Sequence, residues 1–155
     1  MSRHQKDRSW FIDFSNKLSN KQSVLQVRSF EGRSITSGLQ FSYHGQTNAA
    51  MEPEGEGDMH FENGDFYKGH WWKGKLHGHG EVKLSNRKKY VGAFQNGKQH
   101  GSGKFTWHDG EFYEGEWKFG LFDGFGIYGT PDGVELYCMF KNGLPVIGSK
   151  CQVLS

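Results

Sequence analysis

The fold is decided by the stretch YKGHWWKGKLHGHG at residues 67–80, because the same frame returns twice further along the chain. The frame is Tyr-x-Gly-x-Trp-x-x-Gly followed, after two residues, by His-Gly-x-Gly. Residues 90–103 repeat it with Phe in place of Trp, and residues 113–126 repeat it with Asp in place of His. The leading tyrosines stand 23 residues apart each time. Tandem copies at a fixed spacing predict a repeat array.

Within each copy the side chains alternate with a period of two. Tyr67, Gly69 and Trp71 alternate with Lys68 and His70, so the aromatic residues share one face of a strand. The second half of each copy alternates in the same way. Each copy is therefore predicted to be a β-hairpin.

Turn signals separate the strands. A glycine-rich turn is expected within the first copy at residues 74–78, and Asn63-Gly64, Asp109-Gly110 and Asp132-Gly133 separate successive copies. Asn-Gly and Asp-Gly favour type I′ turns, whose two central residues need positive φ. Asn86-Arg87 breaks this pattern, which predicts a longer or looser turn there.

The expected fold is all-β: one elongated antiparallel sheet of tandem hairpins, about eight strands long, with an irregular N-terminal segment. Residues 1–40 form the N-terminal segment, flexible or capping, residues 41–148 the array, and residues 149–155 a tail. The array divides into a degenerate copy at 43–64, good copies at 65–87, 88–110 and 111–133, and a decayed copy at 134–148.

The glycines that keep their place in the copies are predicted to be structural. They leave room for aromatic rings to lie over the backbone and let the sheet curl. These glycines are Gly69, Gly74, Gly78, Gly80, Gly92, Gly97, Gly101, Gly103, Gly115, Gly120, Gly124 and Gly126.

Composition agrees with this reading and excludes others. Hydrophobic residues make up 34% of the chain and aromatic residues 15%, with 23 glycines against 3 prolines. So many glycines argue against a helical bundle, and so many aromatic residues argue against a disordered chain. No apolar run reaches the length of a transmembrane helix, and Asp13 interrupts the apolar start Trp10-Phe11-Ile12 that a signal peptide would continue.

Net charge and cysteine content give weaker indications of function and location than the repeat does. Residues 1–50 carry seven basic and three acidic side chains (+4), and residues 51–155 carry twelve and fourteen (−2). Two cysteines, Cys138 and Cys151, provide no disulfide framework, so a reducing compartment is expected.

The repeated frame resembles the MORN (membrane occupation and recognition nexus) repeat over residues 53–148, with three good copies and two degraded ones. The resemblance implies an extended, groove-forming β-sheet without catalytic activity. It also implies a scaffold at membranes, cytoskeleton or cilia, in which the aromatic groove cradles a helix or extended segment of a partner. The fourth copy has Leu136 for Tyr and Cys138 for Gly, so the groove is expected to fail there.

The predicted function is therefore a non-enzymatic scaffold or adaptor that binds a segment of a partner protein. The groove residues carried over from the repeat are Tyr67, Trp71, Tyr90, Phe94, Trp107, Tyr113 and Trp117. The alternative is that the same rings form a core, covered either by the ends of the chain or by a partner. The array's net charge of −2 argues against nucleic acid as the partner.

No catalytic residue, metal site or cofactor is expected. His77 and His100 are the turn histidine of the repeat, and His-Gly-His offers no complete ligand set for zinc. His108-Asp109 belongs to no recognisable triad motif. The expected location is cytoplasmic, with cytoskeletal, ciliary or peripheral membrane attachment as alternatives.

The alternative function is a peripheral module for acidic phospholipids. Arg87, Lys88 and Lys89 form the one basic triplet, and the N-terminal segment is basic. In that segment Trp10, Ile12 and Phe14 alternate, and residues 24–27 are a candidate strand. Whether residues 1–40 cover the groove or add strands is left open.

The opposite face becomes apolar toward the end of the array. The explanations are a cap formed by the chain itself, either by its tail or by its N-terminal segment, and a contact with a partner or a second copy. The residues concerned are Phe119, Phe122, Phe125, Ile127, Tyr137 and Met139.

Overall fold

The computed structural model describes residues 25–154, and these residues form one sheet of twelve strands. They contain no helix, and hence none able to span a bilayer. The strands are β1 (Gln26–Arg33), β2 (Gln40–Thr47), β3 (Pro53–Phe61), β4 (Phe66–Trp72), β5 (Lys75–Lys83), β6 (Lys89–Gln95), β7 (Lys98–Thr106), β8 (Phe112–Lys118), β9 (Leu121–Gly129), β10 (Glu135–Lys141), β11 (Leu144–Pro145) and β12 (Gln152–Val153).

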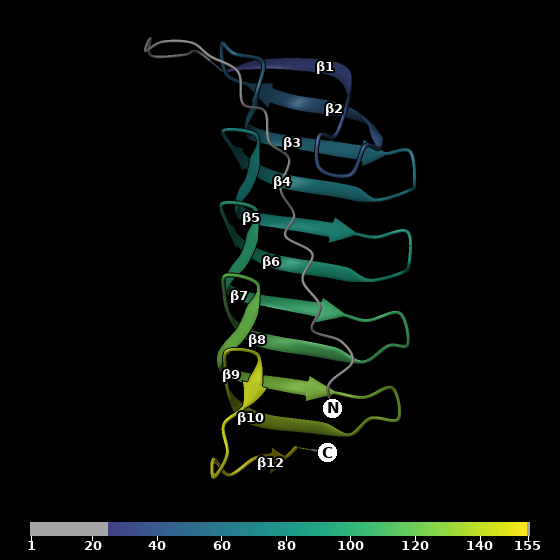
Figure 1. Cartoon of the computed structure of the whole chain (residues 1–155). Helices are drawn as coiled ribbons and strands as arrows, with labels where there is room; N and C mark the ends of the chain where they lie inside the picture. The colour runs from purple at the N-terminus through teal and green to yellow at the C-terminus, as the bar shows by residue number, and fades with distance from the viewer. Residues whose placement is uncertain (1–24, 155) are drawn as a thin grey trace.

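Each strand pairs antiparallel with the next one in the chain, from β1 to β11, and β12 returns to pair with β10 (Figure 1). The predicted all-β array of tandem hairpins is confirmed. The strands number twelve rather than eight because residues 26–33 add β1 to the sheet, the decayed copy at 134–148 adds β10 and β11, and the tail adds β12. Trp10, Ile12 and Phe14 lie outside the described residues.

The tip of each of four hairpins is a two-residue turn. In the β4–β5 hairpin, Lys73 and Gly74 have φ of 48° and 73° between the paired residues Trp72 and Lys75. Two positive φ values identify a type I′ turn. The same turn recurs at residues 96–97, 119–120 and 142–143. The turn predicted at residues 74–78 is thus shorter, because strand β5 already starts at Lys75.

The connections between hairpins are three-residue loops instead of the predicted type I′ turns. The N–H of Gly64 donates to the carbonyl of Phe61, whose own N–H donates to the carbonyl of Asp65. Only the glycine has positive φ, 88°. The loop at Asn86-Arg87 was expected to be longer or looser than those of the other copies, and this prediction is wrong. Arg87 takes the place of the loop glycine and adopts the same conformation, with φ of 64°.

Four hairpins, β2–β3, β4–β5, β6–β7 and β8–β9, bend sharply at their glycines. In the β4–β5 hairpin the register shifts between Gly69 and Trp71, and Gly78 on the facing strand has φ of 71°. Equivalent shifts follow Gly45, Gly92 and Gly115. Because all bends have the same sense, the stacked hairpins form a sheet that curls around one face, here called the inner face (Figure 1).

Successive hairpins are also joined at their tips. The N–H of Gly97 in the β6–β7 turn donates to the carbonyl of Leu76 in β5, at 2.8 Å. The same bond links Gly74 to Pro53, Gly120 to Gln99 and Gly143 to Phe122. Each turn glycine therefore anchors its hairpin to the preceding one, which stabilises the stack as nearest-neighbour contacts do in repeat proteins.

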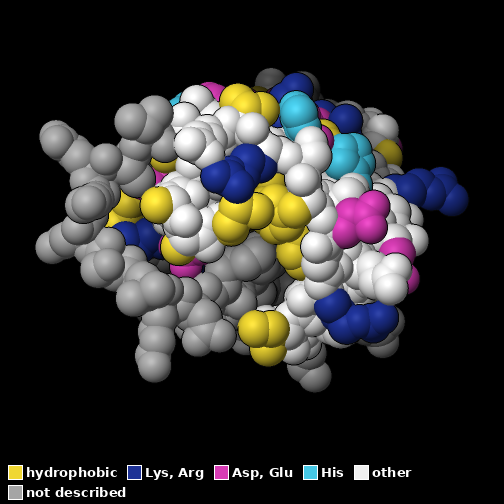
Figure 2. Space-filling view, turned by 90° about the horizontal axis from the view of Figure 1, so that it is seen from above, with side chains coloured by type: hydrophobic (Ala, Val, Ile, Leu, Met, Phe, Trp, Pro, Cys, Tyr) yellow, Lys and Arg dark blue, Asp and Glu magenta, His cyan; other side chains and the backbone are white. Residues whose placement is uncertain are grey.

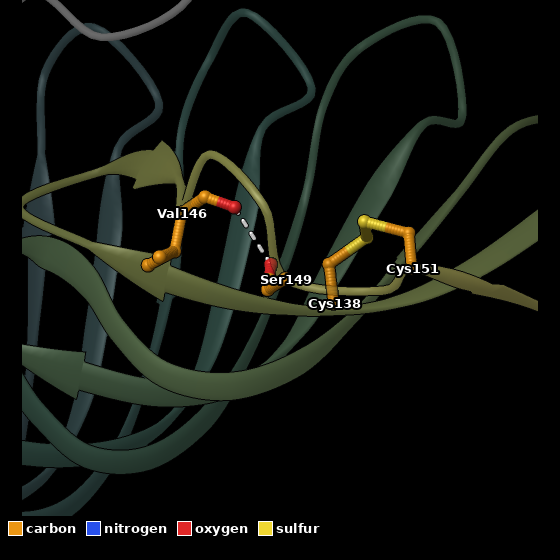
Figure 3. Close-up of a disulfide and its surroundings, with 4 residues drawn as sticks. All are labelled: Cys138, Val146, Ser149 and Cys151. Carbon is orange, nitrogen blue, oxygen red and sulfur yellow. Dashed lines mark hydrogen bonds between the residues drawn. A yellow bond between two sulfur atoms is a disulfide. The ribbon is translucent and has the colours of Figure 1, made fainter.

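The C-terminal residues contain a disulfide that the sequence analysis did not predict. Cys138 in β10 is bonded to Cys151, just before β12, with a Cα–Cα distance of 4.5 Å (Figure 3). Between them, the Ser149 hydroxyl donates to the carbonyl of Val146 at 2.7 Å. The expectation of unpaired cysteines is corrected here: the tail turns back along β10 and brings the two residues together.

Candidate functional site

The inner face carries a ladder of tyrosines that lie over glycines. The hydroxyl of Tyr90 donates to the carbonyl of Ala93 at 2.9 Å, so its ring crosses the backbone at the bend. Tyr43 and Tyr113 make the same bond to Gln46 and Glu116. This arrangement needs glycine beneath the ring: a Cβ on Gly103 would lie 2.2 Å from the Tyr90 hydroxyl.

Tryptophans from the next hairpin complete the ladder. The indole Nε1 of Trp117 donates to the carbonyl of Gly103 at 2.9 Å, and its ring lies 5.2 Å from that of Tyr90. Trp71 makes the same bond to Gly57. Phe94 takes this position in the middle copy and packs over Gly80. The rings therefore connect neighbouring hairpins as well as the two halves of each one.

All seven residues predicted to line a groove lie on the inner face, but they are buried. The most exposed is Tyr67 at 8%, and Tyr113 is at 0%. They are part of the core of the described chain, which comprises Phe41, Tyr43, Met59, Phe61, Tyr67, Trp71, Leu76, Val82, Leu84, Tyr90, Phe94, Trp107, Tyr113, Trp117, Cys138 and Phe140. Little of their own surface is open to another molecule.

Burial also fixes the protonation of the ladder. It raises the pKa of Tyr90 well above the ordinary tyrosine value, and it is the first cause of the raised pKa of Tyr43, Tyr113 and Tyr128. Nearby carboxylates add to the effect: Glu116 beside Tyr113 and Glu111 beside Tyr128. These phenols stay neutral at physiological pH, so they act as hydrogen-bond donors and packing groups.

The accessible part of the inner face is a set of half-buried side chains packed against this core. Phe105, Phe122, Tyr128 and Leu136, here called the inner rim, come from β7, β9 and β10. Phe105 lies 4.9 Å from Trp107, ring centre to ring centre, and Phe122 stacks on Tyr113 at 3.8 Å. Seen along the stack from the β1 end, hydrophobic side chains border the hollow inside the curved sheet (Figure 2).

None of the four inner-rim residues was predicted to line the groove. Phe122 was expected in a turn beside the opposite face, whereas it lies in β9 opposite Trp117. Alternation could have found it, because Phe122 and Tyr128 are in phase with the bend glycines Gly124 and Gly126. Leu136 belongs to the copy in which the groove was expected to fail, yet it packs on the core beside Tyr128.

The patch predicted on the opposite face is exposed. Phe125 stacks on Tyr137 at 5.6 Å, and Met139 lies beside them, each more than a third exposed. Ile127 is half-buried, and Phe119 sits at a hairpin tip 4.9 Å from the ring of His100. The tail pairs with the edge of β10 instead of lying over this patch.

The basic triplet is partly engaged within the sheet. Lys89 bonds to Glu81 at 2.9 Å, and this hydrogen bond is the first cause of the lowered pKa of Glu81. Arg87 is exposed and Lys88 half-buried. Only part of the triplet is therefore available to an anionic surface.

The turn histidines act between hairpins. The Nδ1 of His77 accepts from the N–H of Asn96 at 3.5 Å, and the Nδ1 of His100 from the N–H of Phe119 at 3.4 Å. Asp123 takes the same place in the third copy, where it accepts from the N–H of Asn142. Within the described chain, no three His, Cys, Asp or Glu side chains are grouped to hold a metal ion.

Comparison with known proteins gives a family match in the centre of the chain. The family model of the MORN repeat matches residues 67–86, 90–112 and 113–135. No curated protein sequence matches the chain.

Among solved structures, the chain is similar to the TCP domain of SAS-4 of Drosophila melanogaster, in complex with a proline-rich motif of Ana2. The identity is 11% and the TM-score 0.39, over 92% of this chain and 99% of that one. A likeness this weak carries no argument about a partner or a binding site.

Proposed function

Because the chain is a MORN-repeat protein, we propose that it is a non-enzymatic scaffold that holds a segment of a partner protein against the inner face of its curved sheet. Repeats of this family are typically modules that bind proteins or membranes. The proposed partner is a cytoskeletal, ciliary or membrane-associated protein, and this part of the proposal rests on the family alone.

The observation that carries the proposal is the half-buried inner rim. Three of its four members are apolar rings or chains that pack on the core and still keep accessible surface: Phe105, Phe122 and Leu136. Half-exposed aromatic groups on a rigid support are typical of the anchoring residues of an interface. The fully buried ladder beneath them supplies the rigidity, because its rings are fixed by hydrogen bonds to the backbone.

The shape of the inner face and the chemistry of its side chains define which segment fits there. The rim runs across β7, β9 and β10 within a sheet that curls around it, which suits a narrow segment such as a helix or an extended peptide. Tyr128 adds a polar group at the margin, since its hydroxyl donates to Glu111. The segment proposed here is therefore apolar on the side that faces Phe105 and Phe122.

The test compares two single substitutions in the full chain. Phe105→Ser removes an anchor from the inner rim, and Val91→Ser removes an exposed apolar side chain, 38% accessible, from a different face. Proteins captured by the wild type from extracts of its native cells are quantified, and circular dichroism checks that both variants fold. The Phe105→Ser variant is expected to lose the captured partner, and the Val91→Ser variant is expected to retain it. Equal capture by a folded Phe105→Ser variant would contradict the proposal.

A membrane surface is the competing occupant, through Arg87, Lys88 and Lys89. Sedimentation with vesicles containing acidic phospholipid, at two salt concentrations, distinguishes the two. Electrostatic binding weakens as salt screens the charges. Salt-sensitive binding that disappears when the triplet is changed to Gln would favour the lipid function over the inner rim.

A further inference from the structure

Strand β10 is the last long strand of the sheet, and its outer edge is covered by the C-terminal residues 144–154 of the chain itself. β11 pairs with residues 140–141 of this strand, and β12 pairs Gln152 with Tyr137 and Val153 with Leu136. Two further bonds run from the N–H of Val146 to Met139 and from the N–H of Leu154 to Glu135, both 2.9 Å. An edge of this kind would otherwise present a row of unpaired backbone groups to any extended chain.

Side-chain burial contributes little to this cover. Ile147 is fully exposed, and Val153 and Leu154 are 70% and 49% exposed. The strand pairing of β12 spans two residues only. The feature that fixes the tail is covalent: the disulfide between buried Cys138 and exposed Cys151 (Figure 3).

We propose that the edge of β10 is a strand-addition site gated by this disulfide, which accepts an extended apolar segment of a partner protein once the disulfide is reduced. The site lies at the end of the sheet and shares only Leu136 with the inner rim. The tail acts as a substitute strand that keeps the edge occupied while Cys138 and Cys151 are bonded. Reduction leaves it held by a few hydrogen bonds, which a longer strand can replace.

The opening step requires a dithiol reductant. One thiolate of the reductant attacks the exposed sulfur of Cys151, the S–S bond breaks, and Cys138 leaves as a thiolate that takes up a proton. The second thiol of the reductant then displaces Cys151 from the mixed disulfide and releases it as a thiol. The reductant leaves as a disulfide, having given two electrons to the two cysteines of the protein.

The surroundings of the edge define the segment that fits. β12 already shows that an antiparallel extended chain is accepted there. Alternate side chains of β10 are apolar on both sides: Leu136 and Phe140 point to the core, and Tyr137 and Met139 lie on the outer face. A strand beside them therefore gains apolar contacts on both of its faces, which the tail, with Gln152 opposite Tyr137, does not make fully.

Hydrogen exchange of the full chain tests the gate. Amide protection is measured in the oxidised protein, in the reduced protein and in the Cys151→Ser variant. Reduction and Cys151→Ser are each expected to lower the protection of Tyr137 by about tenfold or more, as local opening of a tail does, while that of Tyr90 in the core is unchanged. Equal protection of Tyr137 in all three forms would overturn the gate.

Peptide trapping tests the site itself. The probe is a synthetic peptide with the sequence of residues 149–155, SKCQVLS, added to the Cys151→Ser variant in a glutathione buffer. The peptide is expected to form a mixed disulfide with Cys138. A control peptide with Gln152→Pro lacks the N–H that pairs with Tyr137, so about fivefold less product is expected, the effect of one lost hydrogen bond. Equal yields from the two peptides, or none from either, would overturn the strand-addition site.

Discussion

The hydroxyl of Tyr90 occupies the space that a side chain on Gly103 would need. A Cβ at that position would lie 2.2 Å from the hydroxyl oxygen and 2.5 Å from the ring carbon that bears it. Gly126 stands in the same relation to Tyr113, and Gly57 to Tyr43. The glycines of the repeat are thus required by the rings that cross them, and the curvature of the sheet depends on both.

This relationship predicts that Gly103→Ala is strongly destabilising. The added methyl group forces the Tyr90 ring off the backbone, an overpacking that costs about 3 kcal/mol in the free energy of unfolding. Gly133→Ala is the matched control: nothing lies within 4 Å of its Cβ, and only its φ of 91° is strained, which costs about 1 kcal/mol. Urea unfolding measures both, and similar losses would contradict the steric explanation.

The indole bonds predict a specific loss in Trp117→Phe. The substitution removes the donor to the part-buried carbonyl of Gly103 and the volume of the larger ring, at a cost of about 2 kcal/mol. Trp72→Phe serves as the control because Trp72 is 45% exposed at a hairpin tip, and a change within about 0.5 kcal/mol is expected there. Thermal and chemical unfolding of both variants provide the comparison, and an unaffected Trp117→Phe protein would refute the role of the bond.

The bonds between hairpins predict that His100 can be exchanged for Asp but not for Ala. His100→Ala removes the acceptor for the N–H of Phe119 and a ring contact, a loss of about 1 kcal/mol. His100→Asp keeps an acceptor, as Asp123 does in the next copy, and should recover part of that loss. The midpoints of chemical unfolding of the two variants measure this difference. Equal midpoints would contradict the claim that residue 100 stabilises the fold by accepting the hydrogen bond from Phe119.

The buried phenols predict a loss of stability in alkali. The pKa of Tyr43, Tyr90, Tyr113 and Tyr128 is raised in the fold, so these groups keep protons that the unfolded chain releases near pH 10. The folded state then binds more protons than the unfolded state, and stability falls as pH rises above about 10. Below that pH the contribution is fully present. Melting curves between pH 9 and 12 measure the effect, with phenolate absorbance recorded alongside. Ionisation of all tyrosines near pH 10 in a still-folded protein would contradict it.

Much of this fold could be predicted from the sequence because the repeat fixes local structure. Alternation around Tyr67 and Trp71 assigned both residues to one face, and the spacing of 23 residues assigned the hairpins. Turn chemistry was less certain, since Asn-Gly is compatible with more than one loop. A type I′ turn was expected at Asn63-Gly64, but a three-residue loop forms there. The type I′ turn lies instead at Lys73-Gly74, where a longer glycine-rich turn was expected.

The burial of the rings could not be predicted in the same way. Alternation tells which face a side chain shares, but whether that face is open depends on how far the sheet curls. The curl arises from register shifts at Gly69, Gly92 and Gly115. The spacing of residues in the sequence does not predict these shifts. The disulfide was missed for a related reason, because the pairing of Cys138 with Cys151 depends on a tail that turns back to β10.

The central claim, that a partner segment lies against the inner rim, is tested most directly by site-specific photo-crosslinking in native cells. A benzophenone-bearing phenylalanine replaces Phe105 on the inner rim or, in the control, Val91 on another face. Covalent capture of a protein segment from position 105 and none from position 91 is the predicted result. Crosslinks from position 91 alone, in a folded protein, would contradict the claim.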